Sequence, residues 1–151
     1  MLFGELDLAV NNHEKAALIG NNGVGKSTLL KIIAGELQET RGHIVSESKP
    51  YYVPQLFGQY NDLTIAQALN IERKLHAFEE ILEGNLTEEN YAVLDDDWTI
   101  EERCVEALKA WKLENPDLSR KMGTLSGGQK TKVFLAGISI HQPQLILMDE
   151  P

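Results

Sequence analysis

Residues 20–27 read GNNGVGKS, a glycine followed by four residues, a second glycine, a lysine and a serine. This is the pattern of a phosphate-binding loop, and the context fits because an apolar stretch precedes it and a helical pattern follows it. Glycines let the backbone turn so that successive amide hydrogens point inward, at the positive end of the next helix dipole. The stretch therefore predicts a nucleoside triphosphate site between a strand at residues 15–19 and a helix at residues 27–37.

Within this loop, Lys26 supplies a full positive charge for the β and γ phosphates, and the Ser27 hydroxyl is placed to bind Mg²⁺. The alternative is a chance match in a turn before a helix. The loop by itself indicates only a nucleoside triphosphate, because many unrelated chemistries use it. The residues predicted to contact the nucleotide here are Asn22, Gly23, Val24, Gly25, Lys26, Ser27 and Thr28.

A pair of acids, Asp149 and Glu150, follows the apolar residues 145–148 near the other end of the sequence. Four apolar residues in a row favour a strand that is covered on both faces. Two carboxylates at its tip, in a chain with a phosphate loop, fit a magnesium site with a neighbouring base. Asp149 would hold Mg²⁺, directly or through water, and Glu150 would polarise the attacking water. The alternative is an ordinary turn before Pro151.

Residues 125–129 read LSGGQ and open another helical pattern. Serine caps helix starts, and a helix start rich in glycine is again an anion-binding geometry. Ser126, Gly127, Gly128 and Gln129 are therefore candidates for a second phosphate contact. The alternative is an ordinary serine cap that follows a loop.

Periodicity places the remaining elements. Residues 51–53 form a short strand that stops at Pro54. A 3.6-residue period predicts helix from residue 64 to Gly84, and residues 84–97 are predicted to be a polar, acidic loop. Residues 99–113 form a helix with Cys104 on its buried face, next to Ile100, Leu108 and Trp111.

The 151 residues, 42% of them hydrophobic, predict one domain with a real core. A single cysteine cannot form a disulfide within the chain and fits a reducing compartment. No apolar run approaches the roughly 18 residues of a membrane span, so we expect a cytoplasmic protein. Residues 59–124 hold 15 acids against 7 bases, which disfavours a direct grip on nucleic acid by this segment.

The combination of GNNGVGKST, LSGGQ and LILMDEP resembles the ATP-binding cassette family. The resemblance implies an α/β fold: a P-loop NTPase cassette core with a small β subdomain and an inserted helical subdomain. Residues 1–151 would be a single partial cassette. Residues 1–58 would be the nucleotide-binding core with the β subdomain, 59–124 the helical subdomain, and 125–151 the signature helix and the acidic strand that returns to the core.

The resemblance also implies ATP and Mg²⁺ as cofactors and ATP hydrolysis as the activity. Gln55 matches the family's lone glutamine that reaches the metal and the water. The catalytic residues would be Glu150, Gln55 and Lys26, and the metal residues Ser27, Gln55 and Asp149. Two cassettes would pack head to tail, so that Ser126 and Gly128 of one close over the γ-phosphate gripped by Lys26 of the other.

At the subfamily level, QKTKVFLAG at residues 129–137, together with residues 96–103 and 141–143, resembles the F subfamily of soluble tandem-cassette proteins that act at the ribosome. Two alternatives stay open: the nucleotide-binding subunit of a membrane transporter, and a fragment that binds nucleotide without turnover. None of the readings expects this chain to insert into a membrane.

The family's adenine-stacking aromatic and its switch histidine are expected to lie outside these residues. His13, His43, His76 and His141 have no ligand-like spacing, so we expect surface or packing roles for them. In the family fold a further strand lies between the phosphate-loop strand and the acidic strand. Without it, exposed strand edges should make residues 1–151 marginally stable, prone to associate and nearly inactive when expressed by themselves.

Overall fold

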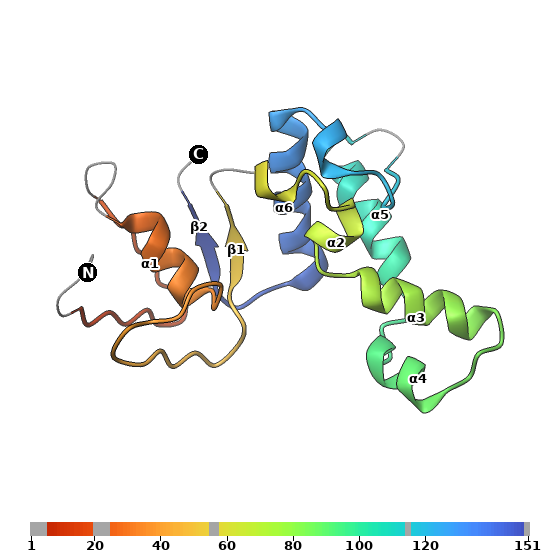
Figure 1. The fold of residues 1–151 in the computed structure, drawn as a ribbon, viewed down its shortest axis with the longest axis horizontal. Coiled ribbons are helices and arrows are strands. Elements are labelled where there is room, and N and C mark those ends of the chain that lie inside the picture. The colour runs from red at the N-terminus through yellow and green to blue at the C-terminus, as the bar shows by residue number, and fades with distance from the viewer. Residues whose placement is uncertain (1–5, 20–24, 55–57, 114–115, 150–151) are drawn as a thin grey trace. The chain divides into compact units, whose positions relative to one another are not determined.

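The computed structural model describes residues 6–19, 25–54, 58–113 and 116–149, which Figure 1 draws as a coloured ribbon. The chain folds as two compact units. The first consists of Met1–Gln55 with Pro143–Pro151, and the second is Leu56–Gln142.

The first unit contains a parallel pair of strands, β1 (Tyr51–Val53) and β2 (Ile146–Met148), in which Tyr52 lies opposite Leu147. The pairing continues past the strands, because the Asp149 amide donates to the Val53 carbonyl oxygen at 2.9 Å. Both strands were predicted from short apolar runs. The pair establishes an α/β arrangement in which distant parts of the sequence meet.

Helix α1 (Lys26–Ile33) begins directly after Gly25 and is shorter than the predicted 27–37. Gly35 ends it in the left-handed conformation, with φ of 82°. The Gly35 amide donates to the Ile32 carbonyl and the Glu36 amide to the Lys31 carbonyl, the two bonds of a Schellman cap. The helix therefore ends at this glycine, although the apolar period continues to Leu37.

The predicted strand at residues 15–19 is wrong, because these residues form no strand in the structure. In the described part of the chain, strand pairing joins only β1 and β2, and an extended segment needs such a neighbour to become a strand. The prediction that residues 145–148 are covered on both faces is also wrong. Leu147 is buried, whereas Ile146 and Met148 are exposed.

The second unit is helical. Its elements are α2 (Ile65–Ala68), α3 (Glu72–Leu82), α4 (Glu88–Leu94), α5 (Ile100–Ala110) and α6 (Gly127–His141), with short 3₁₀ turns η1 (Gly58–Tyr60) and η2 (Met122–Thr124). Helix α5 packs against α6, and α3 packs against α4. The largest fully buried side chains are Leu69, Ile71, Leu94, Ile100, Cys104, Leu108, Met122 and Val133.

Two predictions for this unit need correction. The helix predicted from residue 64 to Gly84 is broken between α2 and α3, where Asn70 takes a left-handed φ of 59°. The loop predicted at residues 84–97 contains α4. Thr87 caps this helix, accepting a hydrogen bond from the Asn90 amide at 3.2 Å, and its Leu94 is fully buried. The Thr87 cap and the burial of Leu94 therefore stabilise a helix here, although the acidic composition favours a loop.

The prediction for Cys104 is confirmed, since the thiol is buried on α5 beside Ile100 and Leu108. Burial raises the pKa of the Cys104 thiol to about 11, so it stays protonated at neutral pH. Trp111 was placed on the same buried face, but it lies just past the end of α5 and is exposed.

The three-part division of the chain stays a prediction. The structure groups residues 125–142 with the helical unit, because α6 packs against α5. The predicted boundaries, 58/59 and 124/125, differ from the observed ones, 55/56 and 142/143.

An ionic cluster ties α3, α5 and α6 together. The Asp97 carboxylate accepts hydrogen bonds from Arg103 and, at 3.3 Å, from Lys74. The Arg103 guanidinium also donates to the Ile140 carbonyl at 3.1 Å, near the end of α6. Burial would raise the pKa of the Asp97 carboxyl, but the hydrogen bonds and charges of Arg103 and Lys74 outweigh it and lower the pKa.

Because the pKa of Asp97 is lower in the folded chain, its carboxylate stabilises the fold at neutral pH and this contribution is lost as the pH falls. Asp97→Asn should reduce the free energy of unfolding by about 1–2 kcal/mol at neutral pH, a modest value because both cations are partly exposed. The difference from the parent should shrink below about pH 4. Urea melts across this pH range check it, with exposed Asp95→Asn as the control. A constant difference at every pH would contradict the assignment.

The first unit leaves apolar side chains of residues 6–19 in solvent, Ile19 most of all at 94% exposed. Exposed apolar segments invite intermolecular pairing. The 151-residue chain should therefore associate reversibly as its concentration rises, and the double substitution Leu8→Lys with Ile19→Lys should shift it toward monomer without lowering its melting temperature. Sedimentation velocity at several concentrations measures this. Monomer at every concentration, or equal association of parent and variant, would contradict it.

Candidate functional site

The start of α1 has the backbone geometry of an anion-binding helix end. Gly25 precedes the helix in the left-handed conformation, with φ of 95°, which favours glycine. The first helical hydrogen bond runs from the Leu29 amide to the Gly25 carbonyl at 2.9 Å. The amides of Lys26, Ser27 and Thr28 come before that bond and face the helix end, where anions bind.

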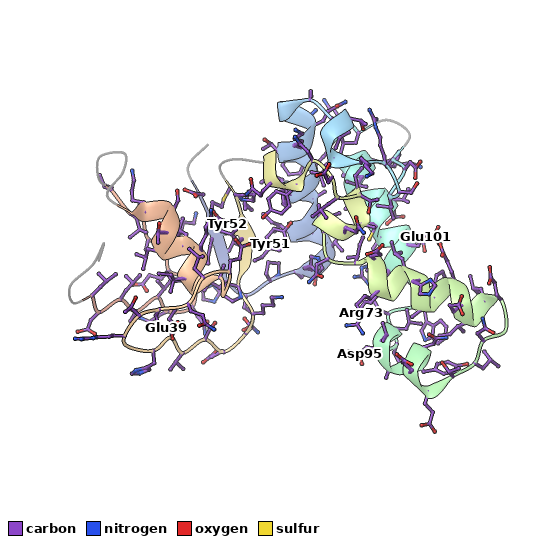
Figure 2. All side chains as sticks on the ribbon, viewed as in Figure 1. Glu39, Tyr51, Tyr52, Arg73, Asp95 and Glu101 are labelled. Atoms are coloured by element: carbon purple, nitrogen blue, oxygen red, sulfur yellow. The ribbon has the colours of Figure 1, made fainter. Side chains whose placement is uncertain are left out.

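The acidic strand end is built around Asp149, whose side chain is buried although it is charged. Tyr52 on β1 donates its phenolic hydrogen to Asp149 Oδ2 at 3.0 Å. Tyr52 pairs with Leu147, and Asp149 lies two residues beyond Leu147, so all three side chains share one face of the strand pair. Figure 2 labels Tyr52 on β1, beside Tyr51.

These two features lie at the same end of the first unit. Figure 1 shows the first turn of α1 and the carboxyl ends of β1 and β2 pointing to one edge. Ligands of α/β sheets bind at the carboxyl ends of the strands. A hydroxyl on Ser27 and a carboxylate on Asp149 are the hard oxygen ligands that Mg²⁺ prefers, and an ionised carboxylate has about four lone-pair sites. The described donors therefore fit a magnesium ion.

The predicted second phosphate contact lies at the start of α6, in the helical unit. Ser126 and Gln129 form a reciprocal capping box: the Gln129 amide donates to Ser126 Oγ at 3.2 Å, and the Ser126 amide donates to Gln129 Oε1 at 2.9 Å. The cap uses Ser126 Oγ as an acceptor, and the hydroxyl also carries an O–H that can donate.

The two glycines that begin α6 have no packing reason within the described chain. A Cβ at Gly127 or Gly128 would meet nothing within 4 Å, and both residues are exposed. Glycine inside a helix costs about 0.8–1 kcal/mol relative to alanine. Their bare backbone therefore suits close approach by a group from outside this chain.

Some predicted site residues lie outside the described residues: Asn22, Gly23, Val24, Gln55 and Glu150. Among those described, the structure gives Gly25, Lys26, Ser27 and Thr28 to one helix end, Asp149 to the strand end, and Ser126, Gly127, Gly128 and Gln129 to the start of α6.

Tyr52 was not predicted as a site residue. Aligning the carboxyl ends of the two apolar runs would have placed it on the face of Asp149.

The four histidines remain outside the site. His141 Nε2 lies 2.7 Å from the Leu69 carbonyl oxygen, and His13, His43 and His76 are exposed. Among the described residues, no three His, Cys, Asp or Glu side chains form a metal-binding group, and no helix has the length and apolar character to cross a membrane.

Residues 3–151 match the ABC transporter family over nearly the whole chain. The chain belongs to the ATP-binding cassette (ABC) family. It therefore has the α/β fold of P-loop NTPases, and cassettes of this family bind ATP with Mg²⁺, are ATPases and work as dimers or tandem cassettes. No solved structure matches this chain.

F-family members are among the relatives, which confirms the likeness to the F subfamily, and import ATP-binding proteins are among them as well. The tylosin resistance ATP-binding protein TlrC of Streptomyces fradiae is 31% identical over 100% of this chain and 32% of its own length. ABC transporter F family member 4 of Dictyostelium discoideum is 31% identical over 99% of the chain and 12% of its own length. The xylose/arabinose import ATP-binding protein XylG of Sulfolobus acidocaldarius is 35% identical over 97% of the chain and 58% of its own length. The chain thus spans less than two thirds of each.

Removing the Tyr52 hydroxyl should loosen Asp149. Tyr52→Phe deletes the donor to Oδ2 and keeps the ring, so the Mg²⁺-dependent part of ATP binding should weaken by about tenfold, the worth of one charge-assisted hydrogen bond. Binding of ATP in EDTA should not change. Titration calorimetry in both buffers measures this. Tyr51→Phe, on the opposite strand face, is the matched control, and an equal metal dependence in Tyr52→Phe and the parent would exclude the positioning role.

Proposed function

We propose that this chain is the MgATP-binding and hydrolysing cassette of an F-type ABC protein that acts at the ribosome. The observation that carries the nucleotide site is the pairing of β1 with β2, because it puts the buried Asp149 at the edge to which the start of α1 also points. The F-type assignment is supported by residues 129–137 and by the F-family relatives.

In this proposal, the backbone amides of residues 23–28 and the Lys26 ammonium hold the β and γ phosphates. Ser27, Gln55 and Asp149 hold Mg²⁺, which supplies charge neutralisation for the phosphates. Tyr52 orients the Asp149 carboxylate. Glu150 takes the proton of the attacking water.

The signature residues serve a second cassette. The Ser126 hydroxyl and the amides of Gly127 and Gly128 would meet the γ-phosphate held by Lys26 of a head-to-tail partner. The open space around both glycines supports this, because nothing in the described chain fills it. Turnover would therefore need two cassettes, and the 151-residue chain by itself should be nearly inactive.

A second candidate is the nucleotide-binding subunit of a membrane transporter. It is favoured by import ATP-binding proteins among the relatives, such as PotA of Salmonella typhimurium, 32% identical over 99% of this chain. Pelleting the full-length protein with purified ribosomes in the presence of MgATP separates the two. Saturable, ATP-dependent co-sedimentation supports the F-type hypothesis. Absence of co-sedimentation, together with co-purification of membrane subunits, supports the transporter hypothesis.

Lys26→Ala should weaken MgATP binding by about 2–3 kcal/mol, roughly 30- to 150-fold, because the side chain that carries the loop's positive charge is removed. The fold should survive, since no buried group is lost. Titration calorimetry on folded protein measures the change. Lys31→Ala, in the last turn of the same helix, is the control and should bind normally. Equal affinity of Lys26→Ala and the parent would remove Lys26 from the site.

In a two-cassette protein, Glu150→Gln should stop phosphate release while leaving ATP binding intact, so the ATP-bound closed state accumulates. Asp149→Asn should instead weaken the metal-dependent part of binding. Single-turnover phosphate release and ATP titrations separate these effects. Hydrolysis by Glu150→Gln at the parent rate would exclude Glu150 as the general base.

A further inference from the structure

The hairpin formed by α3, α4 and the following turn exposes four large apolar side chains. Leu82 is 69% exposed, Leu86 64%, Trp98 45% and Tyr91 42%. We call these four residues the hairpin patch. They fall within 17 consecutive positions, whereas single exposed apolar residues are usually scattered over a surface.

Ring contacts join two members of the patch to each other and to α3. Trp98 packs edge-on against Phe78 of α3, with ring centroids 6.5 Å apart, and against Tyr91 of α4, with centroids 6.2 Å apart. Leu82 follows Phe78 by four residues and so shares its helix face. Leu86 precedes the Thr87 cap and Tyr91 is the fourth residue of α4, the two positions that pair in a hydrophobic staple.

The backbone that carries the patch is held in place. Gly84 turns the chain after α3 with φ of 100°. The Asn85 side chain donates to Glu80 Oε2 at 2.6 Å, and the Asn90 side chain donates to the Asn85 carbonyl at 3.0 Å. The apolar surface is therefore presented by a preformed turn, and binding to it would cost little ordering entropy.

The chain segment that carries the patch is acidic, and the nearest cations in sequence, Lys74 and Arg103, are paired with Asp97. Residues 77–102 contain ten Asp or Glu and no Lys or Arg. Glu79 and Glu83 on α3, Glu88 and Glu89 on α4, and Asp95 at the end of α4 are exposed. Figure 2 labels Asp95 at that helix end. Such a field repels nucleic acid and attracts cations.

We propose that the hairpin patch docks a basic segment of another protein, in which one or two apolar side chains are flanked by lysines or arginines. The apolar side chains would pack on Leu82, Leu86 and Trp98, and the basic ones would face the acidic rim. Apolar centres with complementary charged rims are the usual composition of protein interfaces. Neither Lys26 nor Asp149 belongs to the unit that carries the patch.

The test uses an 18-residue peptide of leucine and lysine with its leucines at helical spacing, and the fluorescence of Trp98 in a Trp111→Phe background. Measurements are made at concentrations where sedimentation shows monomer. The peptide should bind saturably and shift the Trp98 emission to the blue. Leu82→Gln with Leu86→Gln should weaken it at least tenfold, and so, in low salt, should Glu79→Gln with Glu83→Gln.

Matched controls are Leu37→Gln for the apolar pair and Glu36→Gln with Glu39→Gln for the acidic pair, all exposed residues of the first unit that should leave binding unchanged. A peptide of the same composition with its leucines scrambled should bind at least tenfold more weakly. Three results would overturn the proposal: equal binding by the patch variants and their controls, tighter binding of an oligouridylate than of the peptide, or self-association that the Leu82→Gln, Leu86→Gln pair abolishes.

Discussion

The parallel pairing of β1 with β2 is the constraint on which the proposed nucleotide site depends. The two strands are three residues each and are separated by more than 90 residues of sequence. Bringing them together costs chain entropy, and the contacts within each short strand do not offset that cost. The pairing adds backbone hydrogen bonds on both sides of the strands, from Tyr51 to Leu145 and from Asp149 to Val53. It also brings the Tyr52 hydroxyl to the buried Asp149 side chain, to which it donates a hydrogen bond.

The helical unit fixes the conformation of the start of α6 and leaves it exposed. The capping box of Ser126 and Gln129 fixes the first turn, and Phe134, Val133 and Ile140 bury the rest of the helix. Arg103 reaches from α5 to the Ile140 carbonyl near the other end of α6. The exposed glycines therefore sit on a helix anchored along its length, a preorganised surface of the kind that close approach to a phosphate requires.

Features that depend on neighbouring residues were predicted well from the sequence, and features that depend on distant residues were predicted less well. The start of α1 after Gly25, the capped start of α6, and the buried face of α5 at Ile100, Cys104 and Leu108 follow from residues within a few positions of one another, and all three were predicted. The segment at residues 15–19 has the composition of a strand, yet it stays unpaired among the described residues, because composition cannot supply a neighbour. Helix α4 was not predicted, because it has only seven residues and the first three are polar, which is typical of a loop. The Thr87 cap and the burial of Leu94 stabilise it as a helix.

The sequence by itself determined membership of the ABC family, through motifs that each need only a few adjacent residues. It also predicted the chemistry of the site: a glycine-rich turn before a helix, a lysine and a hydroxyl for phosphate and metal, and an acidic strand tip. Only the tertiary structure decided which side chains from distant parts of the sequence meet at these residues. Tyr52 and Asp149 are 97 residues apart, and they meet because the register of two short strands puts them on one face. The ion cluster of Lys74, Asp97 and Arg103 and the aromatic contacts of Trp98 have the same origin. Such partners depend on which segments pack together, and packing is a property of the whole chain that a residue pattern does not contain.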